Sequence, residues 1–487
     1  MPGVKVLVAN RGEIAVRIHR TLSEMGFRSV GIYTEADEGW PFTYELDEVH
    51  PVGSYLNIDE VLDVALRSGA RYVHPGYGFL AENPDFARRV EEAGLTFIGP
   101  SPEAMEMVGD KAKAKEVARR VGVPTVPGSA PSDDPDLLLR EVERIGLPVL
   151  LKAVAGGGGK GMRVVREREN LREVILSARR EALGAFGDPR LMVERYVFPA
   201  RHIEVQVIAD HHGNVLVLGE RECSLQRRHQ KILEETPSVA LDEDLRRRLY
   251  DYARRIVEGV GYTNAGTVEF LYDEERREFY FLEVNARLQV EHPITEMVTG
   301  LDLVRLQMEV AMGRPLPIKQ EDVAVRGHAI EVRLYAEDPE RDFLPSSGRI
   351  EALEFPHMPG LRIDAGVIEG TEVSHLYDPM VAKVISYAPD REQARRRLID
   401  ALKRTLIFGP KTNLHFLIYL LESEEYASGR TYTHTVGGIL GRYLNEDFQL
   451  PEDIREFVRT LRTVRRAEVS DIGEGDLYRR VRPAIYP

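Results

Sequence analysis

Two glutamates, Glu269 and Glu283, lie in neighbouring alternating runs of the chain and could bind a metal ion together. The polar stretch DEERRE separates the two runs, which predicts a β-hairpin. If the glutamates face each other across that hairpin, their Cβ atoms lie ~5 Å apart. Two carboxylates at that spacing repel each other unless a positive charge lies between them. Mg²⁺ prefers carboxylate and phosphate oxygens, so the pair predicts a magnesium site.

The residues that follow Glu283 continue to alternate between polar and apolar types. The polar positions are Glu283, Asn285, Arg287, Gln289 and Glu291. In an extended chain these five side chains share one face of the strand. Carboxylates, amides and a guanidinium in series are typical of a site for a small polar substrate. The alternative is an ordinary amphipathic edge strand, with both glutamates unpaired at the surface.

A glycine-rich loop lies within the segment LLKAVAGGGGKGMRVV, between two apolar runs. Its backbone N–H groups can approach an anion closely, so it could form a mobile lid over phosphates. It is not a Walker A loop, because Val154 occupies the position of the first glycine and Gly161 follows Lys160. The alternative is a flexible hairpin tip. Lys152, inside the preceding apolar run, favours the phosphate interpretation because a buried lysine needs a partner.

A third segment, RECSLQRRHQKILEE, is strongly basic in an otherwise acidic protein. Its cations are Arg227, Arg228, His229 and Lys231. Such a cluster suits phosphate or bicarbonate. A solvated run of charges is the alternative interpretation.

The elements that must position these residues follow from the periodicity. The first hundred residues alternate strand and helix, which predicts a doubly wound α/β unit with a parallel sheet. Ile14, Ile18, Leu22 and Met25 mark the apolar face of its first helix. Later regions are richer in strands, so the overall class is α/β that becomes α+β. We expect five parts, at residues 1–110 (α/β), 111–122 (linker helix), 123–196 (lid with the glycine loop), 197–447 (a β-rich part) and 448–487 (charged tail).

The first α/β unit could instead bind a dinucleotide, but the evidence for that hypothesis is weak. NRGEIA follows the first strand without a G-x-G-x-x-G motif, although Asp37 could serve as the ribose-binding acid. The segment HPGYGFLAEN places a Pro-Gly turn at a strand end, where α/β sheets usually bind ligands.

Composition limits the class of protein. The 487 residues carry a net charge of −14, so binding to nucleic acid is not expected. Cys223 is the single cysteine, which allows no intramolecular disulfide and fits a reducing cytoplasm. The first dozen residues already include charges and predict no signal peptide, and no run of ~18 apolar residues predicts a membrane span.

Taken together, the motifs resemble the biotin carboxylases of the ATP-grasp superfamily. The matching segments are ANRGEIAVR, HPGYGFLAEN, GDKAKAK, KAVAGGGGKGMRVV, ERECSLQRRHQK, EVNARLQVEHPITE and GHAIEVRLYAEDP. They occur in the family's order over about residues 1–445, and seven motifs in register make the resemblance specific. It implies a pre-ATP-grasp domain, a mobile lid and a β-rich C-terminal domain. Arg195 departs from the lysine found in many members, and the tail beyond about residue 447 has no counterpart in the minimal form.

The resemblance also implies site residues. ATP is expected to contact Lys111, Lys152, Gly157, Gly158, Glu194, Arg195, Val197, His202, Gln226, His229 and Leu271. The implied ligands of Mg²⁺ or Mn²⁺ are Glu269, Glu283 and Asn285. Bicarbonate is expected at Lys231, Arg287, Gln289 and Val290. Glu291 resembles the base that deprotonates bicarbonate, Arg333 resembles the guanidinium that stabilises the biotin enolate, and Tyr77 is expected near biotin. The implied catalytic set is Glu291, Arg333, Lys231 and Arg287.

The implied reaction has two stages. Bicarbonate attacks the γ-phosphorus of ATP to give carboxyphosphate, which breaks into CO₂ and phosphate. Phosphate then takes the ureido proton of biotin, and the enolate attacks CO₂. A closed lid is needed because carboxyphosphate hydrolyses in water.

The same resemblance implies partners. No Met-Lys-Met biotinylation motif occurs, so biotin is expected on a separate carrier protein, with the carboxyltransferase on another chain. A homodimer is expected, and the acceptor could be acetyl-CoA, as in fatty acid biosynthesis, or propionyl-CoA or pyruvate. One alternative is another ATP-grasp ligase, such as a carbamoyl-phosphate synthetase half or a purine-pathway carboxylase, which should lack the set Lys231, Arg287 and Arg333. The other is a non-catalytic scaffold, which should have lost Glu291, Lys231 or the metal pair.

Overall fold

The structure is a computed structural model, and it describes residues 3–155, 161–227 and 230–445. By its internal contacts the chain divides into two units, Met1–Leu440 and Gly441–Pro487. All the residues discussed below as parts of the site belong to the first unit. Among the described residues, no helix is both long and apolar enough to cross a bilayer.

The N-terminal part is built on a five-stranded parallel sheet in the order β3-β2-β1-β4-β5. Its strands are β1 (Lys5–Val8), β2 (Arg28–Tyr33), β3 (Glu48–Pro51), β4 (Ala70–His74) and β5 (Thr96–Phe97). Its helices are α1 (Gly12–Glu24), α2 (Phe42–Glu45), α3 (Ile58–Ser68), α4 (Pro84–Glu92) and α5 (Pro102–Gly109), with the 3₁₀ turn η1 (Glu35–Asp37). The predicted parallel α/β unit is confirmed. Ile14, Ile18 and Leu22 are buried as expected, whereas Met25 lies at the helix end and is only half-buried.

The turn after β4 is held by a single buried asparagine. Asn10 Nδ2 donates to the carbonyls of Pro75 and Tyr77, each at 2.7 Å. Gly76 has φ +62°, and a Cβ there would lie 2.9 Å from Asn10 Nδ2, so only glycine fits. Tyr77 is thereby fixed at the carboxyl end of the sheet.

Asp37, the acid that a dinucleotide site would need, has a structural role instead. Arg11 donates two hydrogen bonds of 2.6 Å to its carboxylate, and Tyr55 Oη donates a third of 2.6 Å. The Arg11 guanidinium in turn lies over the rings of Trp40 and Tyr377. These contacts occupy the carboxylate and argue against the dinucleotide hypothesis.

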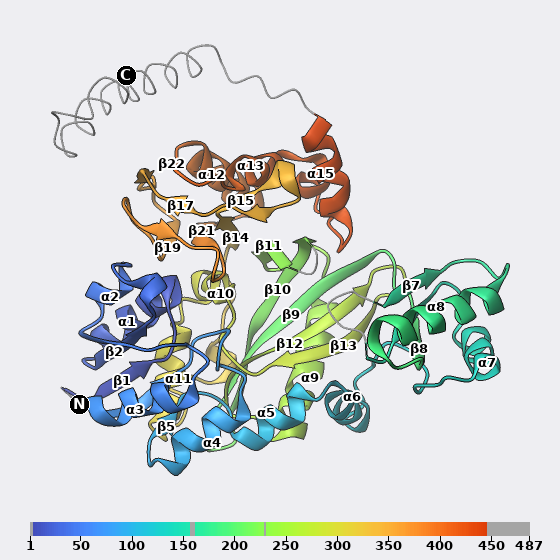
Figure 1. The fold of residues 1–487 in the computed structure, drawn as a ribbon, viewed down its shortest axis with the longest axis horizontal. Coiled ribbons are helices and arrows are strands. Elements are labelled where there is room, and N and C mark those ends of the chain that lie inside the picture. The colour runs from blue at the N-terminus through green and yellow to red at the C-terminus, as the bar shows by residue number, and fades with distance from the viewer. Residues whose placement is uncertain (1–2, 156–160, 228–229, 446–487) are drawn as a thin grey trace. The chain divides into compact units, whose positions relative to one another are not determined.

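A small antiparallel sheet of three strands follows, in the order β7-β6-β8. Its strands are β6 (Val149–Ala153), β7 (Met162–Val165) and β8 (Leu191–Arg195), and helices α7 (Pro135–Ile145) and α8 (Leu171–Phe186) pack with them around a separate apolar core (Figure 1). Helix α6 (Lys111–Arg120) precedes this sheet. The glycine loop between β6 and β7 includes Gly157 and Gly158, which lie outside the described residues.

The largest sheet has eight antiparallel strands in the order β13-β12-β9-β10-β11-β14-β21-β19. These are β9 (Ala200–Ala209), β10 (Val215–Arg227), β11 (Gln230–Thr236), β12 (Asn264–Asp273), β13 (Glu278–Asn285), β14 (His328–Tyr335), β19 (Leu361–Ala365) and β21 (Met380–Ala388). Figure 1 shows β9, β10, β12 and β13 running side by side, with α9 (Glu243–Val260) beside them. The predicted hairpin is confirmed as β12–β13.

One strand prediction is wrong in length. The alternating pattern predicted a strand through Glu291, but β13 ends at Asn285, and residues 286–291 form a loop that leads into α10 (His292–Thr299). The backbone N–H of Ala286 donates to Glu82 from the N-terminal part, which takes the chain out of the sheet. The polar residues after Asn285 therefore do not share one strand face.

The remaining elements complete the first unit and extend just beyond it. The helices are α11 (Leu303–Ala311), α12 (Arg391–Lys403), α13 (Leu414–Glu422), α14 (Glu424–Ala427) and α15 (Thr435–Asn445), with η2 (Gln320–Asp322) and η3 (Pro339–Arg341). Three short ladders pair β15 (Glu337–Asp338) with β16 (Leu344–Pro345), β17 (Gly348–Arg349) with β20 (Glu372–Val373), and β18 (Ala352–Glu354) with β22 (Leu406–Phe408).

Candidate active site

The two glutamates of the hairpin lie directly opposite each other. In the β12–β13 ladder, Glu269 pairs in register with Glu283, as the sequence predicted. Asn285 Nδ2 donates to Glu269 Oε1 at 2.9 Å, and Lys111 Nζ lies 3.1 Å from Glu283 Oε2. Each carboxylate is thus held beside a cation or an amide. Two facing carboxylates are ligands that fit Mg²⁺, and the Asn285 amide lies beside them with its oxygen accepting from Arg287 NH2.

Lys231 is the centre of the buried charge cluster. Its Nζ donates to Glu204 at 2.5 Å, to Glu269 at 3.0 Å and to Glu291 at 2.6 Å. Burial alone would lower the pKa of Lys231, but the three carboxylates outweigh burial and raise that pKa well above its ordinary value. The lysine is therefore charged, and it links β9, β12 and the loop after β13.

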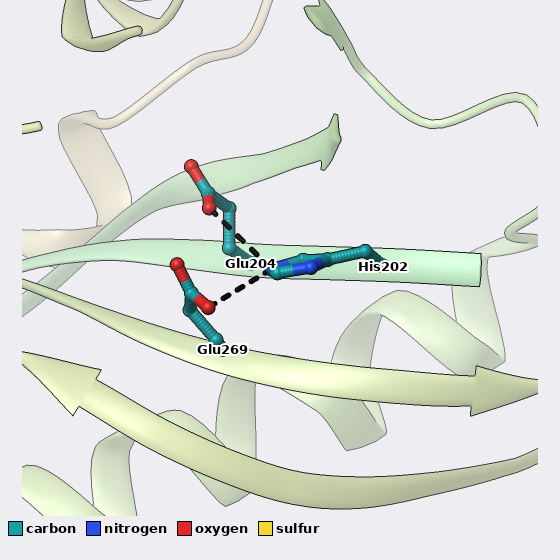
Figure 2. Close-up of side chains that lie close together, drawn as sticks. All are labelled: His202, Glu204 and Glu269. Carbon is teal, nitrogen blue, oxygen red and sulfur yellow. Dashed lines mark ion pairs between the residues drawn. The ribbon is translucent and has the colours of Figure 1, made fainter. Parts of the chain in front are cut away.

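His202 faces the same carboxylates. Figure 2 shows its ring directed at Glu204 and Glu269, with Nε2 3.0 Å from Glu269 Oε2 and 3.9 Å from Glu204 Oε2. Ligand atoms of these three residues lie within 4.8 Å of one another, and the set Glu204, Cys223 and Glu291 has the same property. Both groups include a carboxylate bound to Lys231, whose ammonium already balances part of their negative charge.

Glu291 is fully buried and bound by cations on two sides. Lys231 approaches one of its oxygens, and Arg333 NH2 donates to the other at 3.1 Å. Burial would raise the pKa of Glu291, but Lys231, Arg333 and Arg221 together hold the pKa well below its usual value. The carboxylate is therefore ionised at neutral pH.

Arg333 bridges two carboxylates. It donates to Glu234 Oε1 at 2.7 Å as well as to Glu291. Burial and the nearby Glu291 carboxylate raise the pKa of Glu234 to about 7, despite the opposing charges of Arg333 and Lys231. The guanidinium thus lies between the expected base and a second buried carboxyl group, whose pKa is raised.

The predicted bicarbonate residues of the 286–291 loop form their own hydrogen bonds. Arg287 NH1 donates to Gln289 Oε1 at 3.0 Å, and its NH2 donates to Asn285 Oδ1 at 3.2 Å. Arg287 Nε donates to Glu82 at 2.9 Å, which ties the loop to the N-terminal part. Although the loop is not a strand, it gathers Arg287, Gln289 and Val290 next to Glu291.

The predicted ATP residues that the structure describes lie on the strands β6, β8, β9, β10 and β12, at the start of α6 and just after β8. Lys152 is only partly buried, and its Nζ forms an ion pair with Glu194. His202 Nδ1 and Gln226 Nε2 lie 2.9 Å apart, with Gln226 as the donor. Val197 is buried in a small cluster with Ala200 and Tyr280, against which Leu271 packs. Arg195 lies at the end of β8, and His229 lies outside the described residues.

The sequence prediction missed several residues that contact the predicted site, namely Glu204, Arg221, Glu234 and Lys115. Glu204 binds Lys231, Arg221 Nε donates to Glu204 Oε1 at 2.6 Å from a fully buried position, and Lys115 Nζ donates to Glu194 at 3.0 Å. One signal was available, because His202, Glu204 and Gln206 alternate as polar residues in an apolar strand. Lys115 is the third lysine of GDKAKAK, and its partner lies 79 residues away in the sequence.

Comparison with known proteins agrees with this geometry. Three family models match the chain: the biotin carboxylase N-terminal domain over residues 3–105, the ATP-binding domain of the carbamoyl-phosphate synthase L chain over 110–319, and the biotin carboxylase C-terminal domain over 331–437. Biotin carboxylase 1 of Bacillus subtilis is 46% identical over 436 residues, which are 88% of this chain and 97% of that protein.

A longer relative and a solved structure extend the comparison. The mitochondrial methylcrotonoyl-CoA carboxylase subunit alpha of Dictyostelium discoideum is 47% identical over 89% of this chain, but the match spans only 63% of that subunit. The biotin carboxylase domain dimer of the Hydrogenobacter thermophilus 2-oxoglutarate carboxylase, solved with MgADP, ADP and bicarbonate, has a TM-score of 0.82 and 44% identity. That match covers 90% of this chain and 98% of the solved one.

The chain belongs to the biotin carboxylase family, with an ATP-binding domain of the type also found in carbamoyl-phosphate synthase. Its activity is the ATP-dependent carboxylation of biotin, the reaction of the biotin carboxylase subunit in a biotin-dependent carboxylase.

Proposed function

We propose that Glu291 deprotonates bicarbonate and that Lys231, Arg287, Gln289 and the Val290 backbone hold it. The activated bicarbonate oxygen attacks the γ-phosphorus of ATP, ADP leaves, and carboxyphosphate forms. Carboxyphosphate then separates into CO₂ and phosphate. The observation that carries this proposal is the contact of Glu291 with both Lys231 and Arg333 in one buried cluster.

The cations beside Glu291 determine how readily this carboxylate accepts a proton. With Lys231 and Arg333 both bound to it, the carboxylate has a low pKa and is a poor proton acceptor. A bicarbonate anion bound to Lys231 would share that positive charge and raise the pKa of Glu291. The base therefore gains strength when its substrate is bound, and it loses its proton again when the anion has reacted.

We assign the metal to Glu269 and Glu283, with Asn285 beside them. Bound there, Mg²⁺ or Mn²⁺ would neutralise the charge that develops on the transferring phosphoryl group. Lys111 lies beside Glu283 of the hairpin, and Lys152 lies beside Glu194 near the end of β8, the segment that we propose as the adenine-binding hinge. We propose that these two lysines bind ATP phosphates and that Val197, Leu271, His202 and Gln226 line the nucleoside site.

In the second stage, phosphate takes the ureido proton of biotin, and Arg333 stabilises the enolate that attacks CO₂. Tyr77, fixed by Asn10 at the end of the parallel sheet, is proposed to contact biotin. Glycine residues 157 and 158 are assigned to the lid that excludes water during this step.

We also propose the domain limits that the motifs suggested, residues 1–110, 111–122, 123–196, 197–447 and 448–487. The proposed assembly is a homodimer in the cytoplasm that works with a separate biotin carboxyl carrier protein and a carboxyltransferase. Acetyl-CoA is one candidate acceptor, which would give the protein a role in fatty acid biosynthesis. The carboxyltransferase partner would determine which acceptor is carboxylated. A pull-down from native extract, followed by detection of the biotinylated protein and the transferase, tests this assembly.

The direct test is ATP hydrolysis by the purified protein. Phosphate release should require bicarbonate and should increase when free biotin is added, with N-carboxybiotin as product. The alternative, a carbamoyl-phosphate synthetase-like ligase, predicts hydrolysis that responds to glutamine or ammonia instead of biotin. That result would overturn the residue roles assigned above.

Substitution of a metal ligand gives the first site prediction. Glu283→Gln is expected to raise the Mg²⁺ concentration needed for half-maximal activity about 10–100-fold and to abolish most turnover at low Mg²⁺, since an amide is a weaker ligand for a hard cation. The measurement is a Mg²⁺ titration of bicarbonate-dependent ATP hydrolysis. Glu275→Gln, at the exposed tip of the same hairpin, is the control and should titrate like the unaltered protein. A near-normal kcat at low Mg²⁺ for Glu283→Gln would rule out the hairpin site.

A further inference from the structure

One fully buried lysine near the active site has no place in the roles assigned so far. Lys383 lies in the middle of β21, between the buried residues Val381, Ala382, Val384 and Ile385, and its side chain is 0% exposed. Burying an ammonium group is costly unless it is both paired and hydrogen-bonded. The contacts that Lys383 makes therefore indicate its role in the structure.

The ammonium of Lys383 connects three separate segments. Its Nζ donates to the backbone carbonyl of Val290 at 3.0 Å and lies 3.2 Å from Glu13 Oε2, at the start of α1. Asp364 Oδ2, on the neighbouring strand β19, is 4.0 Å away. The ring of Tyr77 lies on another side, with its centroid 5.9 Å from Nζ, a distance at which a cation and an aromatic face attract.

Glu13 and Asp364 supply negative charge, but neither accepts a well-formed hydrogen bond from Lys383. Asp364 already accepts from Arg362, including a bond of 2.7 Å. Glu13 accepts no side-chain hydrogen bond of good geometry among the described residues, and burial raises its pKa to about 7 against the opposing effect of Lys383. The well-formed hydrogen bond of Lys383 is the one to Val290.

That bond acts on the residue next in the chain. The carbonyl of Val290 and the N–H of Glu291 belong to one planar peptide unit. Fixing the carbonyl therefore also fixes the position of the Glu291 backbone nitrogen. Residues 286–291 leave the sheet after Asn285, so no strand ladder holds this peptide. Lys383 supplies a donor to this peptide from outside the loop.

The sheet register explains why Lys383 is well placed for this task. Lys383 is the direct partner of Arg333 in the β14–β21 ladder, so both side chains project from the same face. Arg333 binds the carboxylate of Glu291, while Lys383 binds the peptide carbonyl that precedes it. Two adjacent cations of one sheet thus hold the proposed base, Arg333 at its carboxylate and Lys383 at the peptide group before it.

We propose that Lys383 is a positioning residue for bicarbonate activation, which holds the Val290–Glu291 peptide so that the Glu291 carboxylate faces Lys231 and Arg333. This inference rests on the role proposed above for Glu291. Lys383 itself touches no reacting atom. Because Val290 and Gln289 are assigned to the bicarbonate site, loss of the bond should disturb bicarbonate binding and leave ATP binding intact.

The test compares two substitutions that both break the same ion pair. Lys383→Met removes the ammonium and its bond to Val290, whereas Glu13→Gln removes the partner charge and keeps that bond. Kinetics of bicarbonate-dependent ATP hydrolysis with free biotin, and the Tm, are measured for both. For Lys383→Met we expect the KM for bicarbonate to rise and kcat to fall, by about 10–100-fold in kcat/KM, since small misplacements of a reacting group have effects of this size. The KM for ATP should stay within about twofold.

Glu13→Gln is expected to lower the Tm with little change in the KM for bicarbonate. If the two variants have equal kinetics and differ from the unaltered protein only in Tm, Lys383 has a purely structural role and the proposal fails. Should Lys383→Met not fold, Lys383→Gln, whose shorter side chain carries no charge, replaces it in the same comparison with the same criterion. An unaltered protein without bicarbonate- and biotin-dependent hydrolysis would instead refute the proposed function itself.

Discussion

Glu291→Gln is expected to lower kcat for biotin carboxylation about 10²–10⁴-fold, the range over which general bases contribute to catalysis. Glutamine has nearly the same shape as glutamate but cannot take the bicarbonate proton. Lys231 keeps Glu204 and Glu269 as partners, and Arg333 keeps Glu234, so the site should stay folded. The measurement is the rate of bicarbonate-dependent ATP hydrolysis with saturating biotin.

Glu296→Gln is the matched control for this substitution. Glu296 is also a buried carboxylate of the α10 region, but it pairs with Arg17 and Arg362 at 2.7 Å each and makes no recorded contact with Lys231 or Arg333. Its replacement should lower the Tm and leave kcat within about threefold, as expected for a residue outside the reaction. A kcat for Glu291→Gln within tenfold of the unaltered enzyme would exclude Glu291 as the base.

The pH dependence of stability follows from the same contacts. The folded-state pKa of Glu291 is depressed, because Lys231, Arg333 and Arg221 outweigh burial. An ionised group with a depressed pKa stabilises the fold at any pH above its ordinary pKa of about 4.3. This stabilisation is lost as the pH falls towards the folded-state pKa. The unaltered protein should therefore lose more of its free energy of unfolding between about pH 5 and pH 3 than Glu291→Gln does.

Arg333→Ala is expected to lower the rate of biotin carboxylation at least ~10²-fold, on the scale of losing one group that stabilises developing negative charge. The dissociation constant for ATP should change less than about threefold, because Arg333 contacts Glu234 and Glu291 and not the hinge at Glu194. Calorimetric titration with ATP and the rate of carboxybiotin formation measure the two effects separately.

This substitution should also destabilise the fold, because it leaves two buried carboxylates without their shared partner. Removing one member of a buried ion pair costs roughly 3–5 kcal/mol. Arg391→Ala is the control, since Arg391 binds the carboxylate of Glu235, next to Glu234, with bonds of 2.6 Å and 3.1 Å, outside the described site. It should lose stability but retain carboxylation. If ATP affinity falls with Arg333→Ala, the assignment of Arg333 to the biotin step is wrong.

The β12–β13 hairpin shows which features the alternation of polar and apolar residues predicts and which it does not. Alternation and the DEERRE turn predicted the register that places Glu269 opposite Glu283, because a hairpin pairs residues that are close in sequence. The same pattern failed from Ala286 onward, three residues after Glu283. An alternating sequence cannot indicate that a contact from Glu82, some 200 residues earlier, draws the chain out of the sheet at Ala286.

Lys152 is an intermediate case. Its position in an apolar run correctly indicated a need for a partner, but not that the partner is the hinge carboxylate Glu194 on the next strand of the same sheet. The polar alternation of His202, Glu204 and Gln206 likewise carried a signal that the site prediction did not use.

By itself the sequence determined the parallel N-terminal sheet, the hairpin with its facing glutamates, and the family through seven ordered motifs. The tertiary structure alone decided how the charges are shared: Lys231 between Glu204, Glu269 and Glu291, and Lys383 beneath the Val290 carbonyl. The physical reason is that periodicity sets which face a side chain occupies, whereas the balance of buried charge depends on which distant strands meet on that face.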